Sequence, residues 1–151
     1  MNICFLGNSA TGKSHIVHSL CNSNEIYHPI LTLAIDYSFY NYNNNKIFIW
    51  DCTGSKKIFC IIKTFLPNID MVLIVCNIYD INSINDIDFY INTINNPYHI
   101  IVNTCNYLKS SYSGEKNRLL LENKYPNQYT LLNSSDPNDV TKKIKVILNK
   151  I

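Results

Sequence analysis

The sequence predicts a doubly wound α/β domain, with six strands in a mostly parallel sheet, helices flanking it and one antiparallel hairpin strand. Three observations predict this fold. Short apolar segments alternate with segments of helical periodicity along the whole chain. The continuously apolar segment 71–76 is typical of a central strand that is covered on both faces. A loop containing glycine joins the first strand to the first helix.

The first third of the chain contains a strand, a helix and a hairpin. Residues 2–6 form a short apolar strand, and residues 13–21 place their apolar side chains on one helical face. Segments 35–40 and 46–50 flank the Asn-rich stretch 41–45. Two apolar segments around such a polar tip predict an antiparallel hairpin.

The rest of the chain continues the alternation. A loop from Ser55 runs into a helix that stops before Pro67, and the strand 71–76 follows. A helix is expected over 81–94, with apolar residues at helical spacing, and it ends before Pro97. The remaining expected elements are a strand at 99–102, a weaker helix at 113–124, a strand at 128–132 and a last helix that opens at Asp136-Pro137.

Length and composition favour one soluble globular domain over residues 1–151. Hydrophobic residues make up 46% of the 151 residues and charged residues 16%, which excludes a disordered chain. The net charge of +2 and the lack of a Lys/Arg run argue against nucleic-acid binding. We see no second domain, linker or internal repeat.

Cysteine usage and the chain ends predict a cytoplasmic protein. The six cysteines show no CxxC pair, and several lie in apolar segments, as reduced buried thiols do. No signal peptide and no membrane-length apolar run is apparent. The sequence ends without a prenylation cysteine, so we expect no intrinsic lipid anchor, although partners could recruit the protein to membranes.

Residues 7–14, GNSATGKS, fit the phosphate-loop pattern G-x-x-x-x-G-K-[ST] between a strand and a helix. The glycines let backbone N–H groups converge on phosphates, Lys13 supplies a positive charge, and the Ser14 hydroxyl suits Mg²⁺. The chain has only four glycines, yet Gly7, Gly12 and Gly54 all fall in motifs. The candidate phosphate-binding residues are Gly7, Ser9, Ala10, Thr11, Gly12, Lys13, Ser14 and Gly54.

With this loop and the later WDCTG segment, nearly the whole chain resembles the Ras-like small GTPases, a class of P-loop NTPase, and the Rab branch most closely. Segment 49–54, IWDCTG, is similar to IWDTAG of Rab proteins, and segment 32–37 to their TIGVDF. Segment 103–106, NTCN, lies where the family has NKxD, which reads the guanine base. Segment 134–136, SSD, lies where the family has SAK.

The resemblance implies a role for each matching residue. Ser14 and Thr32 would be hydroxyl ligands of Mg²⁺, and Asp51 would hold the ion through water. Lys13 would bridge the terminal phosphates of GTP, and the Gly54 N–H would contact the γ-phosphate. The implied base-binding residues are Asn103, Asn106, Ser134 and Ser135.

Three departures from the family weaken turnover and guanine selection. Ser55 replaces the Gln that orients the attacking water, and Ser is too short to do so. Asn106 replaces an Asp that accepts two hydrogen bonds from guanine. This change should weaken the free energy of guanine binding by about 2 to 5 kcal/mol. Thr104 replaces a Lys that packs on the base. Tyr27 is the nearest candidate for the aromatic that stacks on guanine, and His28 and Pro29 belong to the first switch loop.

Three functions remain open. The first is a divergent Rab-like switch that binds GDP and GTP with Mg²⁺, hydrolyses GTP slowly, contacts effectors or regulators through segments near 28–37 and 54–66, and by resemblance acts in vesicle traffic. The second is a pseudo-GTPase that acts as a protein-interaction module. The third is another P-loop enzyme, such as a nucleotide kinase, but the only arginine is Arg118 and a kinase needs several cations.

Overall fold

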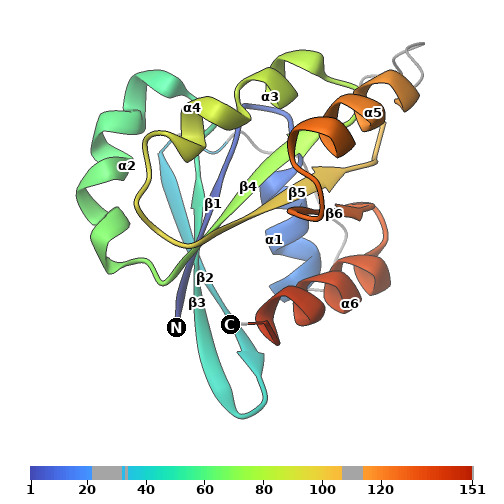
Figure 1. Cartoon of the computed structure of the whole chain (residues 1–151). Coiled ribbons are helices and arrows are strands. Elements are labelled where there is room, and N and C mark those ends of the chain that lie inside the picture. The colour runs from blue at the N-terminus through green and yellow to red at the C-terminus, as the bar shows by residue number, and fades with distance from the viewer. Residues whose placement is uncertain (22–31, 33, 107–113, 151) are drawn as a thin grey trace.

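The computed structural model describes residues 1–21, 32, 34–106 and 114–150. Its centre is one six-stranded sheet with the order β2-β3-β1-β4-β5-β6 (Figure 1). Among the strand pairs of the described residues, only β2–β3 is antiparallel, and the other four pairs are parallel. This confirms the expected mostly parallel sheet with one antiparallel hairpin strand. The strands are β1 (Asn2–Leu6), β2 (Ile35–Tyr42), β3 (Asn45–Cys52), β4 (Met71–Asn77), β5 (Tyr98–Asn103) and β6 (Tyr129–Leu132).

Helices cover both faces of the sheet (Figure 1). The helices α1 (Lys13–Cys21) and α6 (Pro137–Leu148) pack on one face, and the remaining helices pack on the other. These are α2 (Phe59–Phe65), α3 (Ile81–Asn85), α4 (Ile87–Ile91) and α5 (Glu115–Lys124), with short 3₁₀ turns at Lys56–Ile58 and Leu66–Asn68. No helix in the described part of the chain is long and apolar enough to cross a membrane.

Strand β4 shows why the sheet needs both helical layers. All seven of its residues are buried. Val72, Ile74 and Cys76 belong to the core under α2–α5, while Leu73 and Val75 belong to the core under α1 and α6. Successive side chains of a strand point to opposite faces, so a continuously apolar segment requires cover on both sides. The expectation drawn from segment 71–76 is confirmed.

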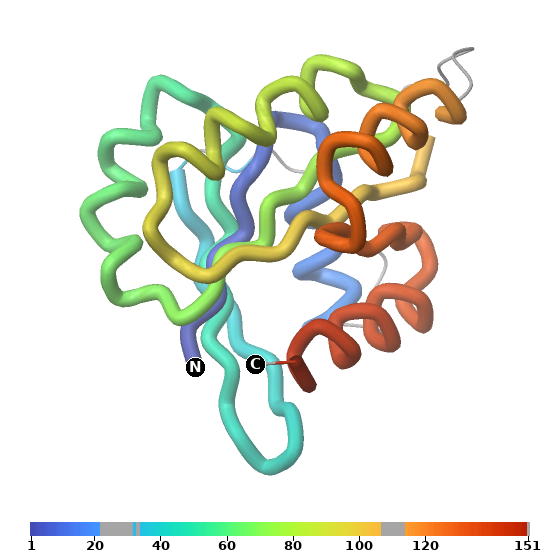
Figure 2. The backbone as a smooth tube through the Cα atoms, viewed as in Figure 1, coloured from blue at the N-terminus to red at the C-terminus, as the bar shows by residue number. Residues whose placement is uncertain are grey.

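The β2–β3 hairpin has its tip where the Asn-rich stretch predicts it, and it extends beyond the rest of the sheet (Figure 2). Asn43 and Asn44 have φ values of 50° and 61°. Two left-handed residues match the right-handed twist of a two-residue hairpin, and Asn tolerates that conformation better than most residues. The Tyr42 hydroxyl donates to Asn149 Oδ1 at 2.6 Å and ties the hairpin to the end of α6.

The expectation of a single helix over 81–94 is wrong. The structure breaks it at Asp86 into α3 and α4, and α4 ends at Ile91. The Asp80 side chain caps α3 by accepting from the Asn82 N–H at 3.0 Å. At the break, the Asp86 carboxylate binds two side chains from other parts of the chain. Periodicity reports the buried face of a helix and carries no information on such contacts.

Candidate functional site

The loop between β1 and α1 has the backbone that its glycines predict. Gly7 has a φ of +141°, and a Cβ there would lie 2.1 Å from the Val75 carbonyl oxygen. Gly12 has a φ of +97°, and Ala10 takes the left-handed conformation at +61°. Side chains other than hydrogen are strained or excluded at the first two positions. The loop follows the carboxyl end of a central parallel strand, where α/β sheets bind ligands.

Lys13 lies beneath this loop and is only 5% exposed. Its ammonium donates to the carbonyl oxygens of Gly7 at 2.9 Å and Asn8 at 2.7 Å. Burial lowers the pKa of Lys13 to about 8, although the Asp51 carboxylate opposes that effect. A buried cation held by two loop carbonyls places positive charge directly under the loop.

Gly54 brings the WDCTG segment against the phosphate loop. A Cβ at Gly54 would lie 2.0 Å from the Ser9 nitrogen and 2.4 Å from the Asn8 carbonyl carbon. Only a residue without a side chain allows this approach. Ser55 follows, and its N–H donates to the Thr53 hydroxyl at 3.3 Å. The two motifs, which are about forty residues apart in the sequence, therefore share one edge of the sheet.

The three residues expected to hold Mg²⁺ lie together. The Ser14 and Thr32 hydroxyl oxygens are 3.0 Å apart, and the Thr32 hydroxyl donates to Asp51 Oδ2 at 3.4 Å. Burial raises the pKa of Asp51 above its ordinary value, while the Ser14 hydroxyl and the Lys13 ammonium act in the opposite direction. Asp51 is 4% exposed, so its carboxylate lies in a region of low dielectric constant.

This arrangement fits Mg²⁺. The Asp51 Oδ1 atom is buried without a hydrogen-bond partner in the described part of the chain. A buried unpaired carboxylate oxygen is costly, and it needs a cation or water to satisfy it. Two hydroxyls and one carboxylate are oxygen donors of the kind that Mg²⁺ prefers, and few protein ligands suit an ion that keeps several waters.

Asn103 connects the expected base-binding loops to the phosphate loop. It is fully buried, and its amide nitrogen donates to the Thr11 carbonyl at 2.9 Å. Its side-chain oxygen accepts from the N–H groups of Cys105 at 3.1 Å and Ser134 at 3.2 Å. The Ser134 carbonyl in turn accepts from the Ser19 hydroxyl at 3.2 Å. Asn103 thus fixes three loops relative to one another.

Of the other expected base-binding residues, Ser134 is fully buried, whereas Ser135 and Asn106 lie at the surface. Ser135 is exposed, and its N–H and hydroxyl both donate to Asn133 Oδ1, at 3.1 and 2.7 Å. Thr104 directs its hydroxyl to the Leu132 carbonyl at 3.2 Å. Asn106 is exposed at the end of the described loop. Tyr27, His28 and Pro29 lie outside the described residues, as do the rest of 28–31 and Leu33 of the first switch segment.

Four residues that support the phosphate loop cannot be recognised from the sequence. Asn8 donates from its amide to Asp86 Oδ2 at 2.7 Å and accepts from the Tyr90 hydroxyl at 3.1 Å. Lys56 pairs with Asp86 Oδ1 at 2.7 Å. Asn8 occupies a variable position of the phosphate-loop pattern, Asp86 lies at the break between α3 and α4, and Tyr90 lies on α4. No spacing rule links these positions.

Aromatic side chains join the two expected switch segments across the hairpin. Tyr37 meets Trp50 edge to face at 5.1 Å between ring centroids, and Trp50 stacks on Phe65 at 5.4 Å. Tyr37 is 55% exposed, and Ile61 on α2 is exposed to the same extent. A continuous apolar row that reaches the surface is a feature of protein-interaction sites.

Together the sheet order, the phosphate loop and the Gly54 approach define the class of Ras-like GTP-binding domains. The family model of the Ras of Complex, Roc, domain of DAPkinase matches residues 2–106. Because that span is more than half of the chain, the chain belongs to the Roc domain family within the Ras-like GTPase superfamily. No curated protein matches the chain in sequence.

Proposed function

We propose that residues 1–151 form one domain that acts as a divergent, Rab-like nucleotide switch, binding GDP and GTP with Mg²⁺ and hydrolysing GTP slowly. The observation that carries this proposal is the convergence of Ser14, Thr32 and Asp51 beneath an intact phosphate loop. Rab-like character rests on the Trp50-Asp51 pair within IWDCTG. Vesicle traffic is the process that this likeness suggests.

The phosphates would be bound by backbone N–H groups over residues 9–14 and by Lys13. The N-terminus of α1 adds its dipole to that field. Mg²⁺, when bound, would neutralise charge on the phosphate oxygens. Ser14 and Thr32 would contribute hydroxyl oxygens to it, and Asp51 would act through bound water. Lys13 moves little in this scheme, because it already lies under the loop.

Slow hydrolysis follows from Ser55. A Ser side chain at this position cannot reach as far as the Gln that orients the attacking water in the family. The backbone around Ser55 is fixed by its N–H bond to Thr53 and by the bond from Ile58 to its carbonyl. The protein would therefore remain in its triphosphate form for longer than an intact GTPase.

Base selection is the second place where this chain departs from the superfamily. Asn106 offers one acceptor and one N–H₂ donor where guanine presents two donors. A base with a carbonyl in place of the guanine amine, as in xanthine, would meet that donor with an acceptor. We therefore expect weakened selection for guanine over xanthine.

Partner proteins would bind the surface around the two switch segments, near 28–37 and 54–66. The row of Tyr37, Trp50 and Phe65 supports this placement, because it links both segments and reaches the surface. The same row supports the second candidate function, a pseudo-GTPase that serves as an interaction module. Under that alternative the changes at Ser55, Thr104 and Asn106 mark a loss of regulated turnover.

Calorimetric titration with GDP and with xanthosine diphosphate, each with and without Mg²⁺, tests the proposal. We expect binding that needs Mg²⁺ and that distinguishes the two bases weakly. The Asn106→Asp variant should bind GDP about tenfold or more tightly, since it restores a charged acceptor. No Mg²⁺-dependent binding of either nucleotide would leave the interaction module as the supported function. Unchanged GDP affinity in the variant would show that the base is not held at this position.

A further inference from the structure

Asp86 lies at the break between α3 and α4 and binds two segments that are distant in the sequence. Its Oδ1 atom pairs with Lys56 Nζ at 2.7 Å, and its Oδ2 atom accepts from Asn8 Nδ2 at 2.7 Å. One carboxylate therefore joins the phosphate loop to the stretch that follows Gly54. We call residues 54–58, which begin with Gly54, the second-loop segment.

Asn8 is held through both its side-chain amide and its backbone carbonyl. Tyr90 donates to its side-chain oxygen at 3.1 Å, and Asp86 accepts from its side-chain nitrogen. Its backbone carbonyl accepts from Lys13 at 2.7 Å and from the Thr11 hydroxyl at 3.0 Å. A single residue, Asn8, thus links the Asp86 carboxylate to the Lys13 ammonium under the phosphate loop.

Lys56 is held on the other side of Asp86 by more than charge. Its ammonium lies 4.9 Å from the centroid of the Phe89 ring, within the range of a cation–π contact. Phe59, which begins α2, packs against Phe89 at 5.4 Å and Tyr90 at 5.7 Å. The second-loop segment is therefore fastened to α4 by an ion pair and by aromatic packing.

The Lys56–Asp86 ion pair is of little importance for the stability of the fold. The side chains of Lys56 and Asp86 are 45% and 28% exposed, and ion pairs with that exposure add little to the free energy of unfolding. Its position is more informative. The second-loop segment touches the phosphate loop at Gly54 and again through Lys56, Asp86 and Asn8. Two separate contacts make the positions of the segment and the loop depend on each other.

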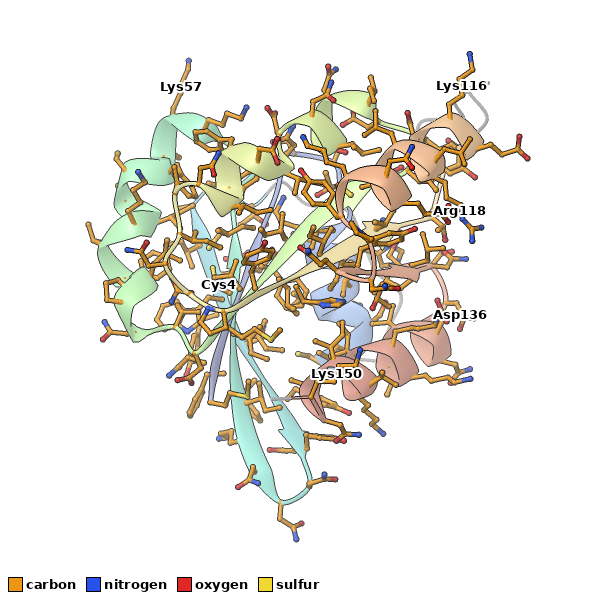
Figure 3. All side chains as sticks on the ribbon, viewed as in Figure 1. Cys4, Lys57, Lys116, Arg118, Asp136 and Lys150 are labelled. Atoms are coloured by element: carbon orange, nitrogen blue, oxygen red, sulfur yellow. The ribbon has the colours of Figure 1, made fainter. Side chains whose placement is uncertain are left out.

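We infer that Asp86 is a positioning residue that couples polyphosphate binding at the phosphate loop to the placement of the second-loop segment through Lys56. This inference rests on the proposed nucleotide binding. Coupling is reciprocal, so if nucleotide binding orders the segment, a change that frees the segment should weaken nucleotide binding. Lys57 provides a matched control, because it is the next residue, carries the same charge and points away from the domain into solvent (Figure 3).

The test measures dissociation of a fluorescent GDP with Mg²⁺, and hydrogen exchange over residues 54–66 with and without GDP, in four proteins. Against the wild type, Lys56→Gln should release the nucleotide about three- to tenfold faster and lose the nucleotide-dependent protection of this stretch. Lys56→Arg should restore both values, because it keeps the charge. Lys57→Gln should match the wild type.

The outcomes separate this inference from the proposed function. If the wild type binds nucleotide and Lys56→Gln behaves as Lys57→Gln does, the coupling through Asp86 is wrong and the proposed function stands. If Lys56→Gln lowers protection equally with and without GDP, the pair is structural and the inference fails. Absence of binding by the wild type, with GDP or xanthosine diphosphate, would overturn the proposed function and the inference together.

Discussion

The Asn103 amide donates a hydrogen bond of 2.9 Å to the Thr11 carbonyl and joins the loop after β5 to the phosphate loop. The same side chain accepts from the N–H groups of Cys105 and Ser134. A residue that is fully buried with three such bonds fixes the geometry of its neighbours. One side chain thereby holds the phosphate loop against the loops that follow β5 and β6.

We therefore expect Asn103→Ala to lower the free energy of unfolding by about 2 to 4 kcal/mol, because it leaves buried backbone groups without partners. Asn106→Ala is the control. It removes an amide from the same loop, but at an exposed position, so it should change stability by less than about 0.5 kcal/mol. Urea unfolding of both variants measures the difference. Equal effects would contradict the role given to Asn103.

Gly54→Ala tests the approach of the second-loop segment to the phosphate loop. The added Cβ would lie 2.0 Å from the Ser9 nitrogen, so backbone must move, and we expect a loss of about 1 to 3 kcal/mol with much weaker nucleotide binding. Gly114→Ala adds a Cβ 3.1 Å from the Ile78 side chain, which can adjust. Thermal unfolding and GDP titration should show little change in that control. A tolerated Gly54→Ala would refute the contact.

Lys13 predicts a dependence of stability on pH. Burial lowers its folded-state pKa to about 8 from 10.5, so between these values the unfolded chain binds more protons at this site. Its contribution to the free energy of unfolding therefore rises with pH across this interval, by up to about 3 kcal/mol. Below pH 8 both states are protonated, and the full cost of burying the charge remains.

Urea unfolding of the wild type and of Lys13→Met, compared at each pH from about 8 to 10.5, isolates this contribution from that of the cysteines. Burial raises the pKa of Cys21 to about 11 and of Cys76 to about 12, and both effects act in the opposite direction. They cancel in the comparison. A stability difference that stays constant over this pH range would contradict the buried charge.

Ser55→Gln should accelerate hydrolysis of GTP in a single turnover by about 10- to 100-fold, because it supplies the reach to orient water. Ser55→Ala should hydrolyse GTP at the wild-type rate, since the Ser hydroxyl has no part in orienting water. Phosphate release from preloaded protein measures both rates. An unchanged rate in Ser55→Gln would mean that another group positions the water or that the site cannot turn over.

The sequence predicts most of the fold because apolar periodicity reports burial directly. The fully apolar β4, the Asn43-Asn44 turn and the Asp136 cap of α6 all follow from local rules. The break at Asp86 does not follow, and neither do the contacts of Asp86 with Lys56 and Asn8, which lie elsewhere in the sequence. Contacts of that kind appear only when the chain is folded.

The candidate site, like the fold, can be predicted only in part from the sequence. Gly7, Gly12 and Gly54 can be found in the sequence because backbone geometry restricts those positions to one residue type. The supporting contacts of Asn8 and Tyr90 cannot be found in the sequence, since many residue types would fit the motif at the position of Asn8. The resemblance to the family also does not predict that the Ser135 N–H donates to the Asn133 side chain.

The most direct test of the nucleotide-switch proposal is to release the nucleotide from freshly purified protein and identify it by chromatography. We expect a guanine or xanthine nucleotide at near-stoichiometric occupancy, retained with Mg²⁺ and lost on chelation. Retained ATP would contradict the proposal. So would an empty site in a protein that no nucleotide with Mg²⁺ stabilises against heat.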